Sequence, residues 1–155
     1  MPLFEDVKNF CQKHDIPVKE FQQPTPTAQA AAEAMSCSVA EIAKTILLKI
    51  GGTYVVVITA GDVRINSSKI KSASGLKGKV IFPSADEVRE QTGYEPGGVS
   101  PFLLPPHLPV FLDQSLQNFP LVFPAGGNAH SSAILSPPKL ADITGGKWVE
   151  VAASP

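Results

Sequence analysis

The sequence predicts a single α+β domain, built on a mixed, largely antiparallel sheet with short flanking helices. Two observations carry this prediction: short helix-like and strand-like segments alternate irregularly, and two apolar runs have the pattern of a β-hairpin. The length of 155 residues fits one domain over residues 1–155, large enough to form a core without a metal or a disulfide. Hydrophobic residues make up 43% and charged residues 17%, which indicates an ordered chain.

Helix-capping residues and helix-ending glycines or prolines mark most of the expected helices. An amphipathic repeat predicts the first helix, and Thr27 can cap the alanine-rich second one. Ser84 and Glu87 have the spacing of a capping box, as do Ser38 and Glu41. The expected helices cover residues 3–14, 28–35, a short segment after 38, 67–75, 84–93 and 137–145.

The strand predictions centre on a hairpin. Residues 44–50 and 53–60 are rich in β-branched side chains, and Gly51 and Gly52 can form the two-residue turn between them. The second run is apolar on both faces, which is typical of a central strand. Further strands are expected over residues 18–22, 80–82, 109–112, 120–123, 131–135 and 147–151.

The charge pattern singles out one basic stretch. The formal net charge is −1, which does not indicate a general nucleic-acid-binding protein. Residues 64–79, however, contain five cations and no acid. Arg64, Lys69 and Lys71 are therefore candidates for contacting phosphates, with a solvated lysine-rich helix as the alternative.

Metal and membrane functions have no support in the sequence. Cys11 and Cys37 form no CxxC motif, and the three histidines lack a paired metal-ligand spacing, so we expect neither a metal nor another cofactor. The longest apolar run, residues 54–60, is too short to cross a membrane, and the N-terminal residues lack the apolar region of a signal peptide. We expect a cytoplasmic protein without membrane contact.

The least regular stretch covers residues 92–105 and reads TGYEPGGVSPFLLP. Gly97 and Gly98 allow close approach of the backbone, and Pro96 and Pro101 stiffen the loop on either side. Such a loop suits the binding of a carbonyl or a phosphate through fixed N–H groups. The alternative is a tight connection between two elements.

Three other features are possible sites: Lys44, a Ser/His/Asp triad around Ser100, and the second glycine corner. Lys44, at the start of a strand, could bind a phosphate or carbonyl oxygen, although a lysine snorkelling at a strand end is the alternative. Ser100 lies in GGVSP and not in a GxSxG elbow, which disfavours a triad of Ser100, Asp113 and a histidine. The second glycine corner, Ala125-Gly126-Gly127, lacks the residues of a P-loop.

Four segments resemble the YbaK/ProRS-editing-domain superfamily of aminoacyl-tRNA deacylases. They are AKTILLKI (43–50), TGYEPGGVSP (92–101), FLD (111–113) and AGG followed by a strand (125–135), and the resemblance spans residues 25–151. It implies a mixed sheet with flanking helices and a freestanding trans-editing enzyme. Such an enzyme hydrolyses the ester of a mischarged tRNA, most often one made by prolyl-tRNA synthetase. Mischarged tRNA and this synthetase are the implied partners.

The resemblance also implies roles for particular residues. Lys44 matches a lysine required for activity near the tRNA 3′ end. The backbone of Gly97 and Gly98, with Ser100, would hold the ester carbonyl or the terminal ribose, while water or a substrate hydroxyl reacts without a protein nucleophile. The other expected substrate-binding residues are Thr27, Thr45, Pro101, Asp113, Gly126, Gly127, His130 and Ser132.

One departure from the family pattern concerns specificity. Cysteine-specific members carry a serine before the second glycine pair and an acidic residue a few positions later, where this chain has Ala125 and Ser132. Alanine, serine, threonine or a small non-protein amino acid is therefore at least as consistent with the sequence as cysteine. Two other functions stay open: a non-catalytic module that binds tRNA ends or a synthetase, and a small-molecule ester hydrolase that uses Ser100.

Overall fold

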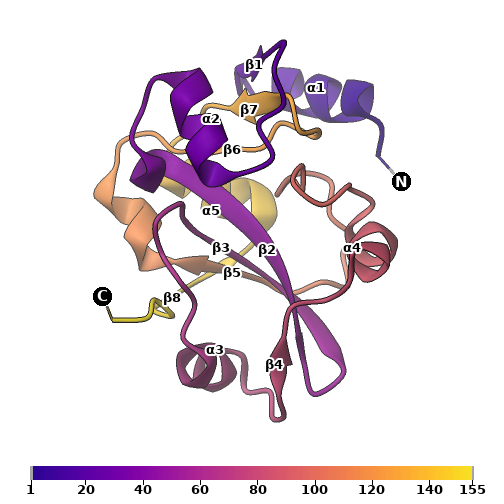
Figure 1. Cartoon of the computed structure of the whole chain (residues 1–155), viewed down its shortest axis with the longest axis vertical. Coiled ribbons are helices and arrows are strands. Elements are labelled where there is room, and N and C mark those ends of the chain that lie inside the picture. Colours follow the sequence, from indigo (N-terminus) through magenta and orange to yellow (C-terminus); the bar gives the residue numbers. More distant parts are fainter. Residues whose placement is uncertain (1, 155) are drawn as a thin grey trace.

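The computed structural model describes residues 2–154 and has five α-helices in this range (Figure 1). Side-chain caps begin several of them: Thr27 Oγ1 accepts from Ala30 N, and Ser136 Oγ accepts from Lys139 N. Gly75, Gly93 and Gly145 end three helices in the left-handed conformation. The helices are α1 (Phe4–Lys13), α2 (Ala28–Met35), α3 (Ser67–Ser74), α4 (Ala85–Thr92) and α5 (Pro137–Thr144), with 3-10 helices η1 (Val39–Glu41) and η2 (Gln114–Asn118).

The main sheet is mixed and has the strand order β4-β2-β3-β5-β8, with β6 paired to β2. The predicted hairpin is its longest pairing, an antiparallel register from Ala43↔Ala60 to Ile50↔Thr53. Pairings β2–β4 and β1–β7 are also antiparallel, whereas β2–β6, β3–β5 and β5–β8 are parallel. The strands are β1 (Val18–Glu20), β2 (Ile42–Ile50), β3 (Thr53–Ala60), β4 (Val80–Ile81), β5 (Val110–Asp113), β6 (Phe123–Pro124), β7 (Ser131–Ala133) and β8 (Lys147–Val149).

The hairpin is buried on both faces, as its apolar pattern predicts. Alternate residues such as Leu47 and Ile58 face a core with α1 and α5, whereas Leu48 and Val57 face a core with Ile70 of α3. A smaller cluster packs α2 against the beginning of β2. The predicted α+β class is therefore confirmed.

The structure differs from the predicted elements mainly between β5 and β7. A strand was expected over residues 120–123, but β6 covers only Phe123–Pro124, and Val122 forms an isolated bridge with Leu135. Pro120 and Pro124 lack the N–H that a longer ladder needs. The 3-10 helix η2 was not predicted, and Asp113 caps it.

One edge of β2 stays open between two short partners. Strand β6 pairs with Ile42 and Ala43, and β4 pairs with Lys49 and Ile50. Within the described residues, no strand pairs with residues 44–48 on the side away from β3. In Figure 1, β2 runs from beneath α2 to the hairpin tip beside β4. No helix among residues 2–154 is long and apolar enough to cross a membrane.

Candidate active site

A cavity of about 290 Å³ lies where the first half of β2 meets α2. Its walls come from segments far apart in the sequence, which is typical of a ligand site. Lys44 is the one charged residue among those that line it, and the rest are small, apolar or hydroxyl-bearing. The lining residues are Thr25, Pro26, Thr27, Ala28, Ala31, Ile42, Ala43, Lys44, Thr45, Ile46, Gly97, Val99, Phe123, Ala125, Ser131 and Ser132.

The loop of residues 95–101 is packed against two other segments with little space between the backbones. A Cβ on Gly97, whose φ is +84°, would lie 3.2 Å from Pro26 Cβ. A Cβ on Gly98 would lie 2.8 Å from the carbonyl carbon of Asn128. The segments of residues 25–26 and 128–129 are themselves hydrogen-bonded, because Thr25 N and Thr25 Oγ1 both donate to Ala129 O, at 2.5 and 3.0 Å. The glycine pair therefore lets three backbones converge at the cavity.

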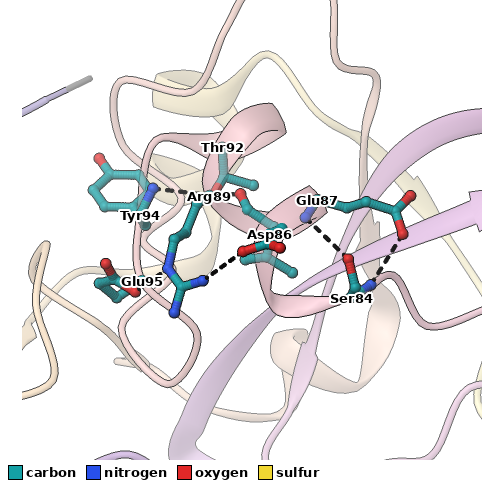
Figure 2. A network of polar contacts seen from close by, with 8 residues as sticks. Ser84, Asp86, Glu87, Arg89, Thr92, Tyr94 and Glu95 are labelled. Atoms are coloured by element: carbon teal, nitrogen blue, oxygen red, sulfur yellow. Dashed lines mark hydrogen bonds and ion pairs between the residues drawn. The ribbon is translucent and has the colours of Figure 1, made fainter.

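Helix α4 holds the beginning of this loop, as Figure 2 shows. The Arg89 side chain donates to Glu95 Oε2 at 2.5 Å and to Asp86 Oδ1 at 3.1 Å. Tyr94 N donates to Thr92 Oγ1 at 3.1 Å, and the Tyr94 hydroxyl donates to Phe102 O across the base of the loop. These contacts fix both ends of the loop and pre-organise its N–H groups.

The N–H groups of the loop are not equivalent. Gly98 N donates to Glu95 O at 3.0 Å, so this N–H already has a partner inside the turn. Among the described residues, no acceptor is found for the N–H groups of Gly97 and Val99, both of which line the cavity. The N–H groups of this loop that are available to a ligand are therefore those of Gly97 and Val99, on either side of Gly98.

Lys44 is half-buried beside the cavity. Its Nζ donates to Val63 O at 2.7 Å, which leaves two of its three N–H donors for a ligand. Burial lowers the pKa of Lys44 from its ordinary value, the nearby Asp62 carboxylate raises it, and Arg64 lowers it further. A cation held in place by a backbone carbonyl suits an anionic or partly negative ligand atom.

Thr45 contributes an unpaired polar atom to the same cavity. Its Oγ1 is buried and has no hydrogen-bond partner among the described residues. A buried hydroxyl without a partner costs about 1–3 kcal/mol, so such atoms are rare outside functional sites. A ligand group that formed a hydrogen bond with Oγ1 would remove this cost.

The remaining predicted site residues divide into two groups. Thr27 and Ser132 line the cavity with Lys44, Thr45 and Gly97. Ser100 and Pro101 are buried beneath the loop and do not line it, and Ser100 Oγ accepts from Phe102 N at 3.3 Å. Sequence reasoning missed Thr25, Val99 and Ser131, although the polar Thr25-Pro26-Thr27 run was a usable signal.

Four other predicted residues also lie outside this cavity. Asp113 is buried, and its carboxylate accepts from Ser115 N at 3.0 Å and Val151 N at 2.8 Å, which gives it a structural role. Gly126 packs against Ser131 and Gly127 packs against Val7, whereas His130 is exposed.

The three predicted phosphate-contacting residues have different surroundings. Arg64 lies close enough to Lys44 to influence its pKa. Lys69 Nζ binds Glu150 Oε1 at 2.8 Å and Ala152 O at 2.9 Å. Lys71 lies in α3, on the sheet face opposite α1 and α5. Within residues 2–154, no cluster of three or more acidic, histidine or cysteine side chains could hold a metal ion.

Comparison with known proteins identifies the family. The family model "Aminoacyl-tRNA editing domain" matches residues 22–143, most of the chain. The chain belongs to the aminoacyl-tRNA editing domain family. This confirms the resemblance drawn from the sequence and the expected class of enzyme, an aminoacyl-tRNA hydrolase.

Individual relatives agree with this assignment. YwhH of Bacillus subtilis, an uncharacterized protein, is 38% identical over 136 residues, which cover 86% of this chain and 85% of YwhH. Proline–tRNA ligase of Bacillus licheniformis is 35% identical over 113 residues, or 70% of this chain, which matches only 19% of that longer enzyme. A solved structure described as a proposed trans-editing enzyme for prolyl-tRNA synthetase is 27% identical, has a TM-score of 0.88, and is matched over 99% of both chains.

Proposed function

We propose that this editing-domain protein removes a small, uncharged amino acid from mischarged tRNA(Pro) in the cytoplasm. The observation that carries the proposal is the cavity itself, whose lining includes one cation (Lys44), one residue with an unpaired hydroxyl (Thr45) and two residues (Gly97 and Val99) whose N–H groups have no acceptor among the described residues. The similarity to proline–tRNA ligase and to a proposed prolyl-tRNA synthetase trans-editing enzyme supports tRNA(Pro) as the substrate.

The proposed chemistry is the addition of water to the ester carbonyl. The N–H groups of Gly97 and Val99 would stabilise the developing oxyanion, and Lys44 would hold the terminal ribose or its phosphate. The bond between the carbonyl carbon and the ribose oxygen then breaks, the ribose oxygen takes a proton, and the free amino acid and the tRNA are released. No protein nucleophile takes part, in keeping with the buried position of Ser100.

The lining residues favour a small and neutral side chain on the substrate. Ala28, Ala31 and Phe123 form apolar walls, and Thr27, Ser131 and Ser132 supply polar groups without charge. Alanine, serine, threonine and cysteine fit this description. The relative EbsC of Enterococcus faecalis, 26% identical over 146 residues, is described as a proposed Cys-tRNA(Pro)/Cys-tRNA(Cys) deacylase. Methylene-sized differences change binding by about 1–3 kcal/mol, so a graded preference among these four is expected.

Single-turnover hydrolysis of a tRNA panel tests the proposal. The panel is tRNA(Pro) charged with alanine, serine, threonine, cysteine or proline, incubated with the wild-type protein and with Lys44→Ala. We expect hydrolysis of at least one small amino acid, little hydrolysis of prolyl-tRNA(Pro), and a loss of at least about 100-fold in Lys44→Ala. Binding without turnover would instead indicate a non-catalytic tRNA-end module, and full activity of Lys44→Ala would refute the mechanism.

A further inference from the structure

The far end of β2 presents an aromatic side chain and two lysines to solvent. Phe82, which follows β4, is 75% exposed, the highest value among the large hydrophobic side chains described as exposed. Ile81 beside it is 39% exposed, and Lys77 and Lys79 are exposed as well. Neither lysine forms an ion pair within residues 2–154.

The turn that carries the lysines is firmly attached to the hairpin. Gly51 N donates to Lys79 O at 3.2 Å. A Cβ on Gly78 would lie 2.6 Å from Gly51 Cα, so only glycine allows this contact between the two turns. The two lysines therefore project from a fixed turn and not from a loose loop.

Two acidic side chains of α4, Glu87 and Asp86, are paired with cations. Glu87 accepts from Lys49 Nζ at 3.2 Å and from the Tyr54 hydroxyl, and Asp86 accepts from Arg89 at 3.1 Å. The contacts with Tyr54 and Lys49 and the capping contact with Ser84 lower the pKa of Glu87 to about 2, so it is ionised and paired at neutral pH. Neither of these two carboxylates forms an ion pair with Lys77 or Lys79.

The position of Phe82 relative to the cavity follows from the sheet register. Val80 pairs with Ile50 and Ile81 with Lys49, and Phe82 is the next residue after this pairing. Lys49 is four residues from Thr45, or ~13 Å along the strand. The cavity and strand β4, which Lys79 and Phe82 flank, therefore lie along the same edge of β2, on the side where residues 44–48 have no strand partner.

We propose that Phe82, Lys77 and Lys79 form a platform for the unpaired 3′ nucleotides of tRNA, with Phe82 stacking on a base and the lysines binding phosphates. The inference rests on the proposed function, which places the terminal ribose in the cavity. An exposed aromatic ring flanked by unpaired cations is the combination that recognises single-stranded nucleic acid without base-specific contacts. A protein partner is less consistent with a patch whose only free charges are two cations.

Direct binding tests the platform independently of hydrolysis. The probes are uncharged tRNA(Pro) and a short single-stranded RNA that ends in CCA, and affinity is measured by fluorescence anisotropy at several salt concentrations. We expect Phe82→Ala to weaken both affinities about tenfold. Leu3→Ala removes another exposed side chain, 68% exposed just before α1, and should leave both affinities unchanged.

A charge variant provides the second measurement. We expect K77Q/K79Q to reduce the slope of log affinity against log salt by about 0.7 for each phosphate that a lysine of the platform neutralises. The matched control K13Q/K147Q changes two exposed lysines on α1 and β8 and should keep the wild-type slope. Equal binding by Phe82→Ala and Leu3→Ala, or equal slopes for the two double variants, would overturn the platform.

Hydrolysis separates failure of the platform from failure of the proposed function. An aminoacyl ester of adenosine reaches the cavity but not Phe82, so wild type and Phe82→Ala should hydrolyse it equally. Absence of hydrolysis of every mischarged tRNA by the wild type refutes the proposed function, while the binding data still decide the platform. Loss of affinity for prolyl-tRNA synthetase in Phe82→Ala, with RNA binding intact, would assign the patch to a protein and overturn the inference.

Discussion

The two glycine pairs of this chain have the same composition and different surroundings. Gly97 borders the cavity, and the pair brings its loop against Pro26 and the turn of residues 128–129. Gly126 and Gly127 face inward, where a Cβ would lie 2.8 Å from Ser131 Oγ and 2.9 Å from Val7 Cγ2, respectively. The first pair positions backbone donors at a ligand site, whereas the second lets a corner pack on β1 and α1.

The difference shows that a glycine pair indicates close approach of the backbone to another group, but not whether that group is a ligand or another part of the protein. At the first pair the neighbouring N–H groups of Gly97 and Val99 lack acceptors among the described residues. At the second pair, Gly126 N donates to Ser131 O at 3.2 Å, and neither glycine of this pair lines the cavity. We therefore expect substitutions at the first pair to reduce hydrolysis and substitutions at the second to reduce stability.

The largest effect on hydrolysis among these variants is expected for Gly98→Ala. The added methyl would meet the backbone of Asn128 and Ala129, at 2.8 and 2.9 Å, and neither can rotate away. The loop must shift, which misplaces the donors on both sides of residue 98. We expect the single-turnover rate to fall by about 100-fold, the effect of losing one oxyanion donor, while circular dichroism still reports a folded protein.

Thr45→Val should have an intermediate effect on hydrolysis and the opposite effect on stability. The variant removes the buried Oγ1 that has no partner in the described structure and keeps the shape of the side chain. We expect the rate to fall about tenfold if the hydroxyl binds substrate, and the free energy of unfolding to stay equal or rise. Urea denaturation measured alongside the rate checks both. A large loss of stability would mean that Thr45 has a structural partner.

Ser100→Ala should change hydrolysis by less than about threefold, because Ser100 Oγ is buried outside the cavity and supplies no donor to the carbonyl. Loss of its bond with Phe102 N should reduce the free energy of unfolding by about 1 kcal/mol. Abolished hydrolysis in a folded Ser100→Ala protein would favour the ester hydrolase that uses a serine nucleophile.

Gly127→Ala should have the smallest effect on hydrolysis and a clear effect on stability. Its φ of +114° and the contact with Val7 both oppose a side chain. We expect a loss of about 1–3 kcal/mol in the free energy of unfolding, with an unchanged rate per folded molecule. A wild-type melting temperature together with a slow rate would place this corner in the active site after all.

The sequence predicted most of the fold because local signals were consistent with the tertiary structure. The hairpin follows from its Gly-Gly turn and β-branched runs, and helices α2, α4 and α5 follow from their caps. The extent of the short strand β6 could not be predicted, since it depends on pairing with Ile42 and Ala43, about 80 residues earlier in the chain.

The candidate site was predicted less completely, for a physical reason. Lys44 and Gly97 stand out by residue type, and both line the cavity. Asp113 has the residue type of a site residue, but its two oxygens bind backbone N–H groups. Which polar groups lack partners is a property of the packed structure, so the free N–H of Val99 and the hydroxyl of Thr45 become significant only there.

The central claim is that backbone donors in the loop of residues 95–101, and not a side chain of that loop, act on the ester. The most direct test compares the single-turnover deacylation rates of Gly98→Ala and Ser100→Ala on the same mischarged tRNA(Pro), at the same temperature and with folding verified for both. We expect Gly98→Ala to be slower than Ser100→Ala by at least about tenfold. The reverse order would contradict it.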